Sequence, residues 1–413
     1  MKKMTFLAAL PLITAALLAF ASCSKGDAAP EDFGEEKNTY DEPSGAPVSD
    51  GDYGGDYGGD YGEGGQGEGG QAEAGVLTAG EWNDLAHWDF WCKLWQSQDY
   101  AEALHVWGFN TSRRVAVRVK YAEEETCIVA PGVNVPVELW SGDQCIWTAK
   151  TDINGVANCW AGLYDEIPES TLTLKVGGKS AEAKVSTAGE VVWNEFDVSS
   201  SHSELTADIA FIVDATGSMC DEIEFLKEDL LSILNTVRES RQYMEIRTGA
   251  VFYRDKGDEY ITRHEDFSAD ITKTMAFIQQ QNADGGGDLP EAVHTALDVT
   301  LQKLRWNTSA WSRLAFLVLD APAHYNDAEV IKSLHRSIAS FAQQGIRIIP
   351  VLASTGDKSA EFMCREFAIV TGGTYVFLTD DSGVGESHLE PTVGEFEVEK
   401  LKDLLIRLIN EYI

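Results

Sequence analysis

One carboxylate and two hydroxyl side chains follow a mostly apolar run in the middle of the chain. Asp214, Thr216 and Ser218 come directly after the run Ile209–Val213. Carboxylate and hydroxyl oxygens are hard ligands of the kind that Mg²⁺ binds. A helix that starts near Met219 would add free backbone N–H groups at the same place. The segment therefore predicts a divalent-cation site at the end of a buried strand, with an ordinary strand-to-helix turn capped by Ser or Thr as the alternative.

Two later segments carry acidic side chains in comparable positions. A glycine-rich loop, residues 284–291, contains Asp288 and opens a helix at Pro290, and proline is favoured in the first helical turn. A second apolar run ends at Asp320. Because the ligands of open α/β sheets gather at the carboxyl ends of the strands, we expect both segments to meet Asp214 in one site.

The pattern Asp214-x-Thr216-x-Ser218, followed in order by the glycine-rich loop and Asp320, resembles the metal-ion-dependent adhesion site (MIDAS) of von Willebrand factor A domains. The resemblance implies that Asp214 and Asp320 ligate the cation directly or through water, and that Thr216 and Ser218 contribute hydroxyl oxygens. It also implies Mg²⁺, or Ca²⁺ or Mn²⁺, as the cofactor. One coordination position would stay open, and an Asp or Glu carboxylate of a protein partner would fill it.

The second loop departs from the family pattern. The Leu-Pro-Glu-Ala segment places Gly287 where the family usually has Thr, so Asp288 is adjacent to that position rather than equivalent to it. If Asp288 ligates, it adds negative charge and reduces the need for an acidic partner group. If it does not, water completes the shell and the affinity for metal falls. Asp288 is included as a candidate ligand.

Residues 205–413 alternate strand patterns with helical patterns. This alternation predicts a doubly wound α/β domain with a mostly parallel sheet, von Willebrand A or Rossmann-like in type. The short segment Tyr260–His264 fits an antiparallel strand at the sheet edge.

Residues 76–200 differ in character and hold nine of the eleven tryptophans. Six short strand patterns predict a small all-β sandwich domain, and Asn154-Gly155 favours a hairpin turn because both residues accept positive φ. Together with the segment 132–137, this turn resembles sandwich modules related to carboxypeptidase regulatory domains. We expect the indoles to fill the core. The alternative is that they stack on sugar rings.

The N-terminal residues have the composition of a targeting segment. Two lysines precede an apolar stretch up to Ala21, which predicts a signal peptide over residues 1–22. Small residues before Cys23 resemble a bacterial lipobox, which implies lipid attachment to Cys23. Residues 23–75 are acidic and glycine-rich, so they predict a disordered tether. We therefore expect an exported protein anchored by lipid to the bacterial outer membrane, on its periplasmic or its surface side.

The cysteines limit the possible disulfides, and the net charge limits the possible partners. Six cysteines besides Cys23 allow several disulfide pairings, and Cys145 with Cys159 is the first choice because they flank a short strand pair. A net charge of −35 argues against nucleic acid as a partner. His324 follows Asp320 closely, but no nucleophile motif accompanies it, so we expect a rim residue rather than a catalytic base.

These patterns favour a lipid-anchored, non-enzymatic binding protein of the cell envelope that uses a divalent cation to engage a protein partner. One alternative is a glycan-binding or hydrolytic envelope protein that uses the Trp-rich region. Another is a metal-independent assembly scaffold. The sequence leaves open the identity of the partner, the identity of the metal, the disulfide pairing and the oligomeric state.

Overall fold

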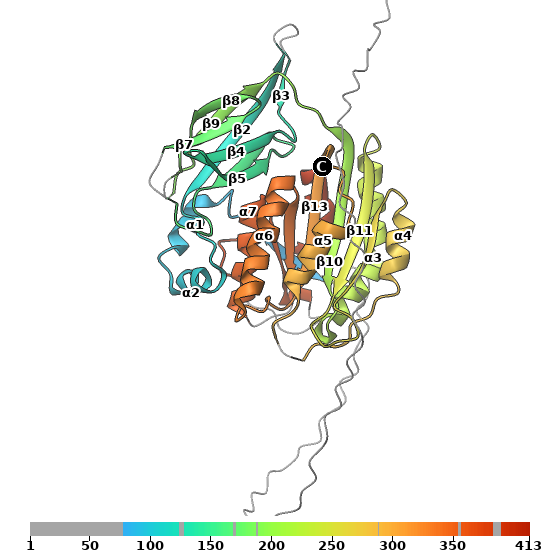
Figure 1. Ribbon diagram of the computed structural model, residues 1–413. Coiled ribbons are helices and arrows are strands. Elements are labelled where there is room, and N and C mark those ends of the chain that lie inside the picture. The colour runs from blue at the N-terminus through green and yellow to red at the C-terminus, as the bar shows by residue number, and fades with distance from the viewer. Residues whose placement is uncertain are drawn as a thin grey trace, which may run out of the picture. The chain divides into compact units, whose positions relative to one another are not determined.

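The computed structural model describes residues 77–123, 128–167, 171–186, 189–287, 289–353, 357–382 and 390–413 (Figure 1). All of these residues belong to one compact unit, Glu68–Ile413. The predicted signal peptide, the lipid attachment residue Cys23 and the predicted tether lie outside the described residues. Within the described ranges, no helix combines the length and the apolar character needed to cross a membrane.

A mixed sheet of eight strands forms the larger part of the fold. In spatial order its strands are β12 (Thr262–Ser268), β11 (Glu245–Tyr253), β10 (Glu204–Asp214), β13 (Ala310–Leu319), β14 (Arg347–Leu352), β15 (Tyr375–Thr379), β1 (Thr78–Trp82) and β16 (Glu399–Lys400). Neighbours from β11 to β15 run parallel, whereas β12, β1 and β16 pair antiparallel toward the edges. The mostly parallel sheet and the antiparallel edge strand β12 confirm the predicted arrangement.

Helices cover both faces of this sheet (Figure 1). They are α3 (Cys220–Ser240), α4 (Ile271–Ile278) and α8 (Leu401–Tyr412) on one face, and α5 (Val293–Lys303), α6 (Ala328–Gln344) and α7 (Lys358–Thr371) on the other. Both faces of strand β10 carry apolar side chains, so both need a covering layer. Its side chains alternate between two cores: Ile209, Phe211 and Val213 enter one, and Ala210 and Ile212 enter the other. A strand buried on both faces has a continuous apolar sequence.

Strand β1 differs from the sequence expectation. Residues Thr78–Trp82 fall in the range predicted for the Trp-rich domain, yet they pair antiparallel with β15 across five positions. The pairing joins residues that are about 300 positions apart in the chain, such as Thr78 and Thr379. A run of only five residues contains no sequence signal for so distant a partner.

The Trp-rich region contains two helices, α1 (Trp88–Leu94) and α2 (Gln98–Trp107), and two sheets of four strands. In one sheet β2 (Arg114–Glu123) pairs with β3 (Ile128–Pro131), β6 (Val156–Trp160) and, in parallel, β9 (Trp193–Val198). The other sheet has the order β5 (Gln144–Lys150), β4 (Pro136–Ser141), β7 (Leu172–Val176) and β8 (Lys179–Glu182).

The turn at Asn154-Gly155 connects these two sheets and does not close a hairpin. Strand β5 precedes the turn and pairs with β4, whereas β6 follows it and pairs with β2. The hairpin expectation was therefore wrong, although Gly155 has the positive φ of 73° that the turn chemistry predicts. Cys145 and Cys159 lie on these same two strands and are both free thiols, so the preferred disulfide is not formed.

Most indoles are buried, which agrees with the core interpretation. Trp88, Trp91, Trp107 and Trp160 are at most 2% exposed. Trp91 packs 6.1 Å from Phe362 of α7, measured between ring centroids, and Phe109 packs 5.9 Å from Phe367. The aromatic residues thus join the Trp-rich region to the helices of the large sheet in one continuous core.

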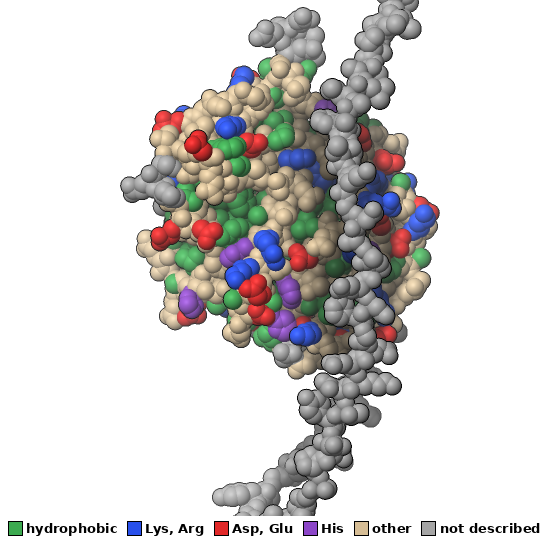
Figure 2. All heavy atoms as spheres, in the orientation of Figure 1, with side chains coloured by type: hydrophobic (Ala, Val, Ile, Leu, Met, Phe, Trp, Pro, Cys, Tyr) green, Lys and Arg blue, Asp and Glu red, His purple; other side chains and the backbone are tan. Residues whose placement is uncertain are grey.

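The net charge of −35 is not spread evenly along the chain. Residues 24–75 hold fourteen Asp and Glu against two Lys, a difference of 12 negative charges. On the face shown in Figure 2, acidic and basic side chains are scattered among uncharged ones. Negative charge is therefore most concentrated in residues 24–75, whereas this face of the folded unit carries side chains of both signs.

Candidate metal centre

Asp214 is the last residue of β10 and is fully buried. Its Oδ1 accepts hydrogen bonds from the backbone N–H of Thr216, at 2.9 Å, and from the Thr216 hydroxyl, at 2.8 Å. Its Oδ2 is buried and has no hydrogen bond of standard geometry among the described residues, although the Tyr253 hydroxyl lies near the carboxylate and lowers its pKa. Burial raises the pKa of Asp214 to about 7, with the charge of Asp320 as the next cause.

Asp320 lies beside Asp214 because their strands are parallel neighbours. Strands β10 and β13 pair in register up to Val213 and Val318, and Asp320 directly follows the end of β13. Asp320 is 7% exposed. The structure therefore brings together the two aspartates that the sequence placed at strand ends.

Neither Ser218 nor Asp288 is among the buried ligands that the structure describes. Ser218 belongs to the short 3₁₀ helix η1 (Gly217–Met219) and is exposed, although it follows Thr216 by only two positions. Asp288 lies outside the described residues. The structure thus places Asp214, Thr216, Ser218 and Asp320 at one end of the sheet and leaves the role of Asp288 a prediction.

Glu291 is a member of the site that the sequence analysis did not assign. It is only 3% exposed, and its Oε2 is buried with no partner among the described residues. Burial raises the pKa of Glu291 to about 9, followed by the charges of Asp214, Asp255 and Asp258. The sequence predicted a helix that opens at Pro290, but α5 begins at Val293, so Glu291 precedes the helix. A glutamate in a predicted first helical turn is expected to be solvated, so the residue type alone gave no signal.

The glycine-rich loop buries Glu291 by docking on its neighbours. The N–H of Glu291 donates to the carbonyl of Pro322 at 2.9 Å, and Glu291 forms a parallel bridge with Ala323. Gly286, with a φ of +74°, passes so close that a Cβ there would lie 3.2 Å from Thr216 Cβ and 3.3 Å from Glu291 Oε1. The loop glycine is thus required both by its backbone conformation and by its close approach to the site.

A fourth acidic group lies at the start of α3. Glu222 is 7% exposed, and burial raises its pKa to about 7, with Asp320, Asp221 and Asp214 as further causes. Asp214, Glu222, Glu291 and Asp320 therefore form a buried acidic cluster, in which the charge of Asp320 raises the pKa values of Asp214, Glu222 and Glu291 further. Buried carboxylates of this kind require a counter-charge or a proton.

The rim of the cluster carries His324 and Arg254. His324 Nε2 lies 2.7 Å from Asp255 Oδ1, which confirms a rim residue satisfied by a local hydrogen bond. Arg254 is buried, with an exposed fraction of 4%. Its Nε donates to the carbonyl of Ala215 at 3.0 Å, so it holds the turn after β10 in place.

The side chains present fit a hard cation. Asp214 Oδ2 and Glu291 Oε2 are buried oxygens without a hydrogen bond of standard geometry, and both pKa values are raised by neighbouring negative charge. Among the described residues, no group of three or more His, Cys, Asp and Glu side chains has the arrangement of a complete metal site. Two of the expected ligands, Thr216 and Ser218, carry hydroxyl groups, however. The predicted ligand set therefore does not require three acidic, histidine or cysteine side chains.

Residues 208–380 match the model of the von Willebrand factor A domain family. The chain therefore contains a von Willebrand factor A domain, which includes β10, β13 and the acidic cluster.

Two curated proteins are similar to part of the chain. A putative ariadne-like RING finger protein of Acanthamoeba polyphaga mimivirus is 28% identical over 191 residues, which is 43% of this chain and 18% of that protein. An alpha-protein kinase of Dictyostelium discoideum is 28% identical over 169 residues, 39% of this chain and 26% of the kinase. The chain thus spans about a quarter or less of the length of these relatives.

One solved structure is also similar. The conserved hypothetical protein BatB from Bacteroides thetaiotaomicron aligns with a TM-score of 0.34 and 10% identity, over 50% of this chain and 98% of that one.

Proposed function

We propose that the von Willebrand A domain binds a divalent cation, with Mg²⁺ the first choice over Ca²⁺ or Mn²⁺, and uses it to engage a protein partner. Asp214, Asp320, Thr216 and Ser218 would hold the cation, and Glu291 would lie near it as a further negative charge rather than as a ligand. The observation that carries the proposal is the pair of buried oxygens without a standard hydrogen bond, Asp214 Oδ2 and Glu291 Oε2. A cation supplies the counter-charge that these carboxylates lack.

The bound cation would supply a Lewis-acidic position at which a partner carboxylate completes the coordination shell. The protein's own residues prepare that position. Thr216 orients Asp214 through two hydrogen bonds, and Gly286 lets the loop backbone approach the site. Leu289 is 53% exposed on the same loop and offers an apolar contact beside the site. A partner with an acidic side chain next to an apolar one would match both features.

We also propose that the protein is non-enzymatic and is held at the bacterial outer membrane by lipid on Cys23, with the tether at 23–75 spacing the folded unit from the bilayer. The Trp-rich region, with its two four-stranded sheets and the helices α1 and α2, would serve as a module between the tether and the binding domain. Labelling of cells with a palmitate analogue, followed by comparison of wild type with Cys23→Ala, tests the anchor. Equal labelling of the two proteins would contradict it.

Isothermal titration of the purified protein with MgCl₂ tests the metal site. We expect Asp214→Asn and Glu291→Gln each to weaken Mg²⁺ binding at least tenfold, which corresponds to about 1.4 kcal/mol. Glu195→Gln is the matched control, because Glu195 is an exposed carboxylate on β9 with a 56% exposed side chain. Magnesium binding that is unchanged in Asp214→Asn would contradict the proposed site.

A pull-down from envelope extracts tests the partner. We expect proteins that are retained in Mg²⁺ to be released by EDTA, and we expect the Asp214→Asn protein to retain none of them. Retention that survives both EDTA and the substitution would favour the metal-independent scaffold.

A further inference from the structure

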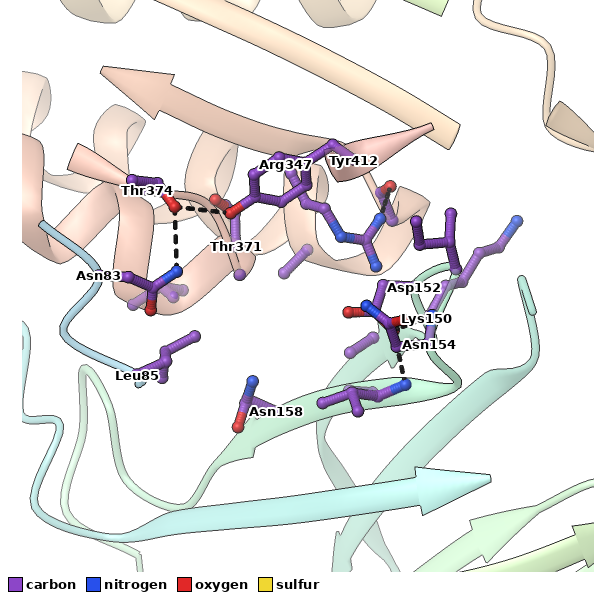
Figure 3. A pocket seen from close by; sticks show the side chains of 18 of the residues that line it. Asn83, Leu85, Lys150, Asp152, Asn154, Asn158, Arg347, Thr371, Thr374 and Tyr412 are labelled. Atoms are coloured by element: carbon purple, nitrogen blue, oxygen red, sulfur yellow. Dashed lines mark hydrogen bonds between the residues drawn. The ribbon is translucent and has the colours of Figure 1, made fainter. Parts of the chain in front are cut away.

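A polar cleft lies between the Trp-rich region and the helices of the large sheet (Figure 3). Its volume is about 490 Å³, within the range of small-molecule sites. One wall comes from the ends of α6, α7 and α8 and the start of β14, and the other from β5, β6, β9 and the loop after β1. Since β14 begins here and its carboxyl end points toward the metal centre, the cleft is a separate site at the opposite end of the parallel strands.

Arg347, the first residue of β14, is the central group of the cleft. It is 5% exposed, and its guanidinium points into the space opposite Asp152 and Asn154 (Figure 3). One guanidinium nitrogen donates to the carbonyl of Gly345 at 2.9 Å, whereas Nε is buried with no partner among the described residues. Burial lowers the pKa of Arg347, and the charge of Asp152 raises it. Among the described residues the guanidinium has no hydrogen bond besides that to Gly345, so its outer N–H groups are left to an acceptor in the cleft.

Amide and hydroxyl groups line both walls. On one side Asn83 Nδ2 donates to Thr374 Oγ1 at 3.0 Å, and Thr374 in turn hydrogen-bonds the Tyr412 hydroxyl at 2.8 Å. On the other side Asn158 lies with its Oδ1 accepting from Arg114 Nε at 2.8 Å. The walls therefore present several groups that can both donate and accept.

Two helix ends also border the cleft. Helices α6 and α7 end at Gln344 and Thr371, and the glycines that follow them, Gly345 and Gly372, line the cleft. Several carbonyl groups at these ends are already bonded, since Phe341 and Ala342 accept from Ile346 and Gly345, and Ala368 accepts from Gly372. The amide and hydroxyl groups of the walls are therefore the partners that the cleft offers to the hydroxyl groups of a ligand.

An aromatic side chain and an excess of cations complete the lining. Trp193 is partly exposed in the cleft, with the guanidinium of Arg118 stacked 4.2 Å from its ring centroid. Three cationic side chains line the cleft against two acidic ones, an excess that is unusual in a chain of net charge −35. They are Arg114, Arg347 and Lys150 against Asp152 and Glu411.

We propose that this cleft binds a sugar-sized polyhydroxylated acid, such as a uronic acid. The ligand's carboxylate pairs with Arg347, its hydroxyl groups bond the amide and hydroxyl groups of the walls, and its ring packs against Trp193. This site differs from the sugar-stacking alternative of the sequence analysis, since most of the tryptophans are buried in the core.

Titration calorimetry with galacturonate, glucose and acetate, all in EDTA, tests the proposal independently of the metal centre. We expect galacturonate to bind at least tenfold more tightly than glucose or acetate. Arg347→Gln should weaken galacturonate binding at least tenfold, and Trp193→Ala should weaken it as well. The control is Arg336→Gln, which removes an exposed arginine of α6 outside the cleft and should leave binding unchanged.

Thermal unfolding of each variant without ligand separates lost binding from lost folding. If Arg347→Gln fails to fold, Lys150→Met replaces it, because Lys150 lies at the end of β5 and is only partly buried. The proposal is overturned if galacturonate does not bind, if acetate or glucose binds as tightly, or if the cleft variants and Arg336→Gln behave alike.

Discussion

Arg365 of α7 and Asp84, which follows β1, form a buried bidentate ion pair across 281 positions of the chain. Arg365 Nη2 donates to Asp84 Oδ1 at 2.7 Å, and Nε donates to Oδ2 at 2.9 Å. The two side chains are 0% and 1% exposed. Arg365 also donates to the carbonyl of Thr392 and to Glu361. The pair therefore ties the segment after the edge strand to the helix layer of the large sheet.

Removing one partner of this pair is predicted to be strongly destabilising. Asp84→Ala removes the bidentate partner of a buried guanidinium, which keeps only Glu361 and the carbonyl of Thr392. The expected loss is about 3 kcal/mol of unfolding free energy. Urea unfolding followed by tryptophan fluorescence measures it. Asp89→Ala is the control, since Asp89 pairs with Lys93 on the surface and its loss should change the unfolding free energy little. Equal losses in the two variants would show that the buried pair does not hold the segment.

Chelation is predicted to reverse the effect of Glu291 on stability. In EDTA the repulsion within the acidic cluster is not relieved, so Glu291→Gln should be at least as stable as wild type. With Mg²⁺ at about 100 times Kd, wild type should gain about 2.7 kcal/mol, and the variant should gain clearly less. Thermal unfolding in the two buffers measures this crossover. A variant that is less stable than wild type in EDTA would contradict a repulsive role for this carboxylate.

The close approach of Gly286 is predicted to matter for metal affinity. Gly286→Ala and Gly178→Ala both place a side chain at a positive φ, +74° and +79°, and each should cost about 1–2 kcal/mol. Only at Gly286 would the new Cβ meet the site, because nothing lies within 4 Å of a Cβ at Gly178. Calorimetry should show weaker Mg²⁺ binding for Gly286→Ala alone. If both variants bind Mg²⁺ like wild type, the loop contact is unimportant for the site.

Glu366 predicts a dependence of stability on pH. This glutamate of α7 is fully buried, and neither oxygen has a partner among the described residues. Burial raises its pKa well above the usual value near 4.5. The folded state then holds a proton that the unfolded state releases. The stabilisation is fully present below about pH 4.5 and is lost as the pH rises toward the folded-state pKa.

Glu366→Gln has no titratable group at this position, so its folded state takes up no extra proton there. We expect the unfolding free energy of wild type to fall more steeply between pH 5 and pH 8 than that of Glu366→Gln. Both proteins are measured by urea unfolding at one fixed EDTA concentration, because Asp214, Glu222 and Glu291 contribute slopes of the same sign and are common to both. Parallel pH profiles would mean that Glu366 is satisfied in the folded state.

The sequence by itself determined the alternation of strands and helices and the positions of Asp214 and Asp320 at strand ends. These features are local, since a strand buried on both faces must be apolar throughout and its first polar residue marks its end. The antiparallel edge strand near residue 262 follows from the same reasoning, and so does the burial of most indoles.

Only the tertiary structure decided which distant groups meet. The pairing of β1 with β15 and the ion pair of Asp84 with Arg365 join positions about 300 residues apart, and no local pattern specifies such partners. Glu291 is buried because the glycine-rich loop docks beside Ala323, although its sequence context is that of an ordinary first-turn glutamate. Arg254 is buried for a similar reason, since its guanidinium is held by the carbonyls of two other segments. The charges of a site depend on burial and on neighbours, and both arise only when the chain has folded.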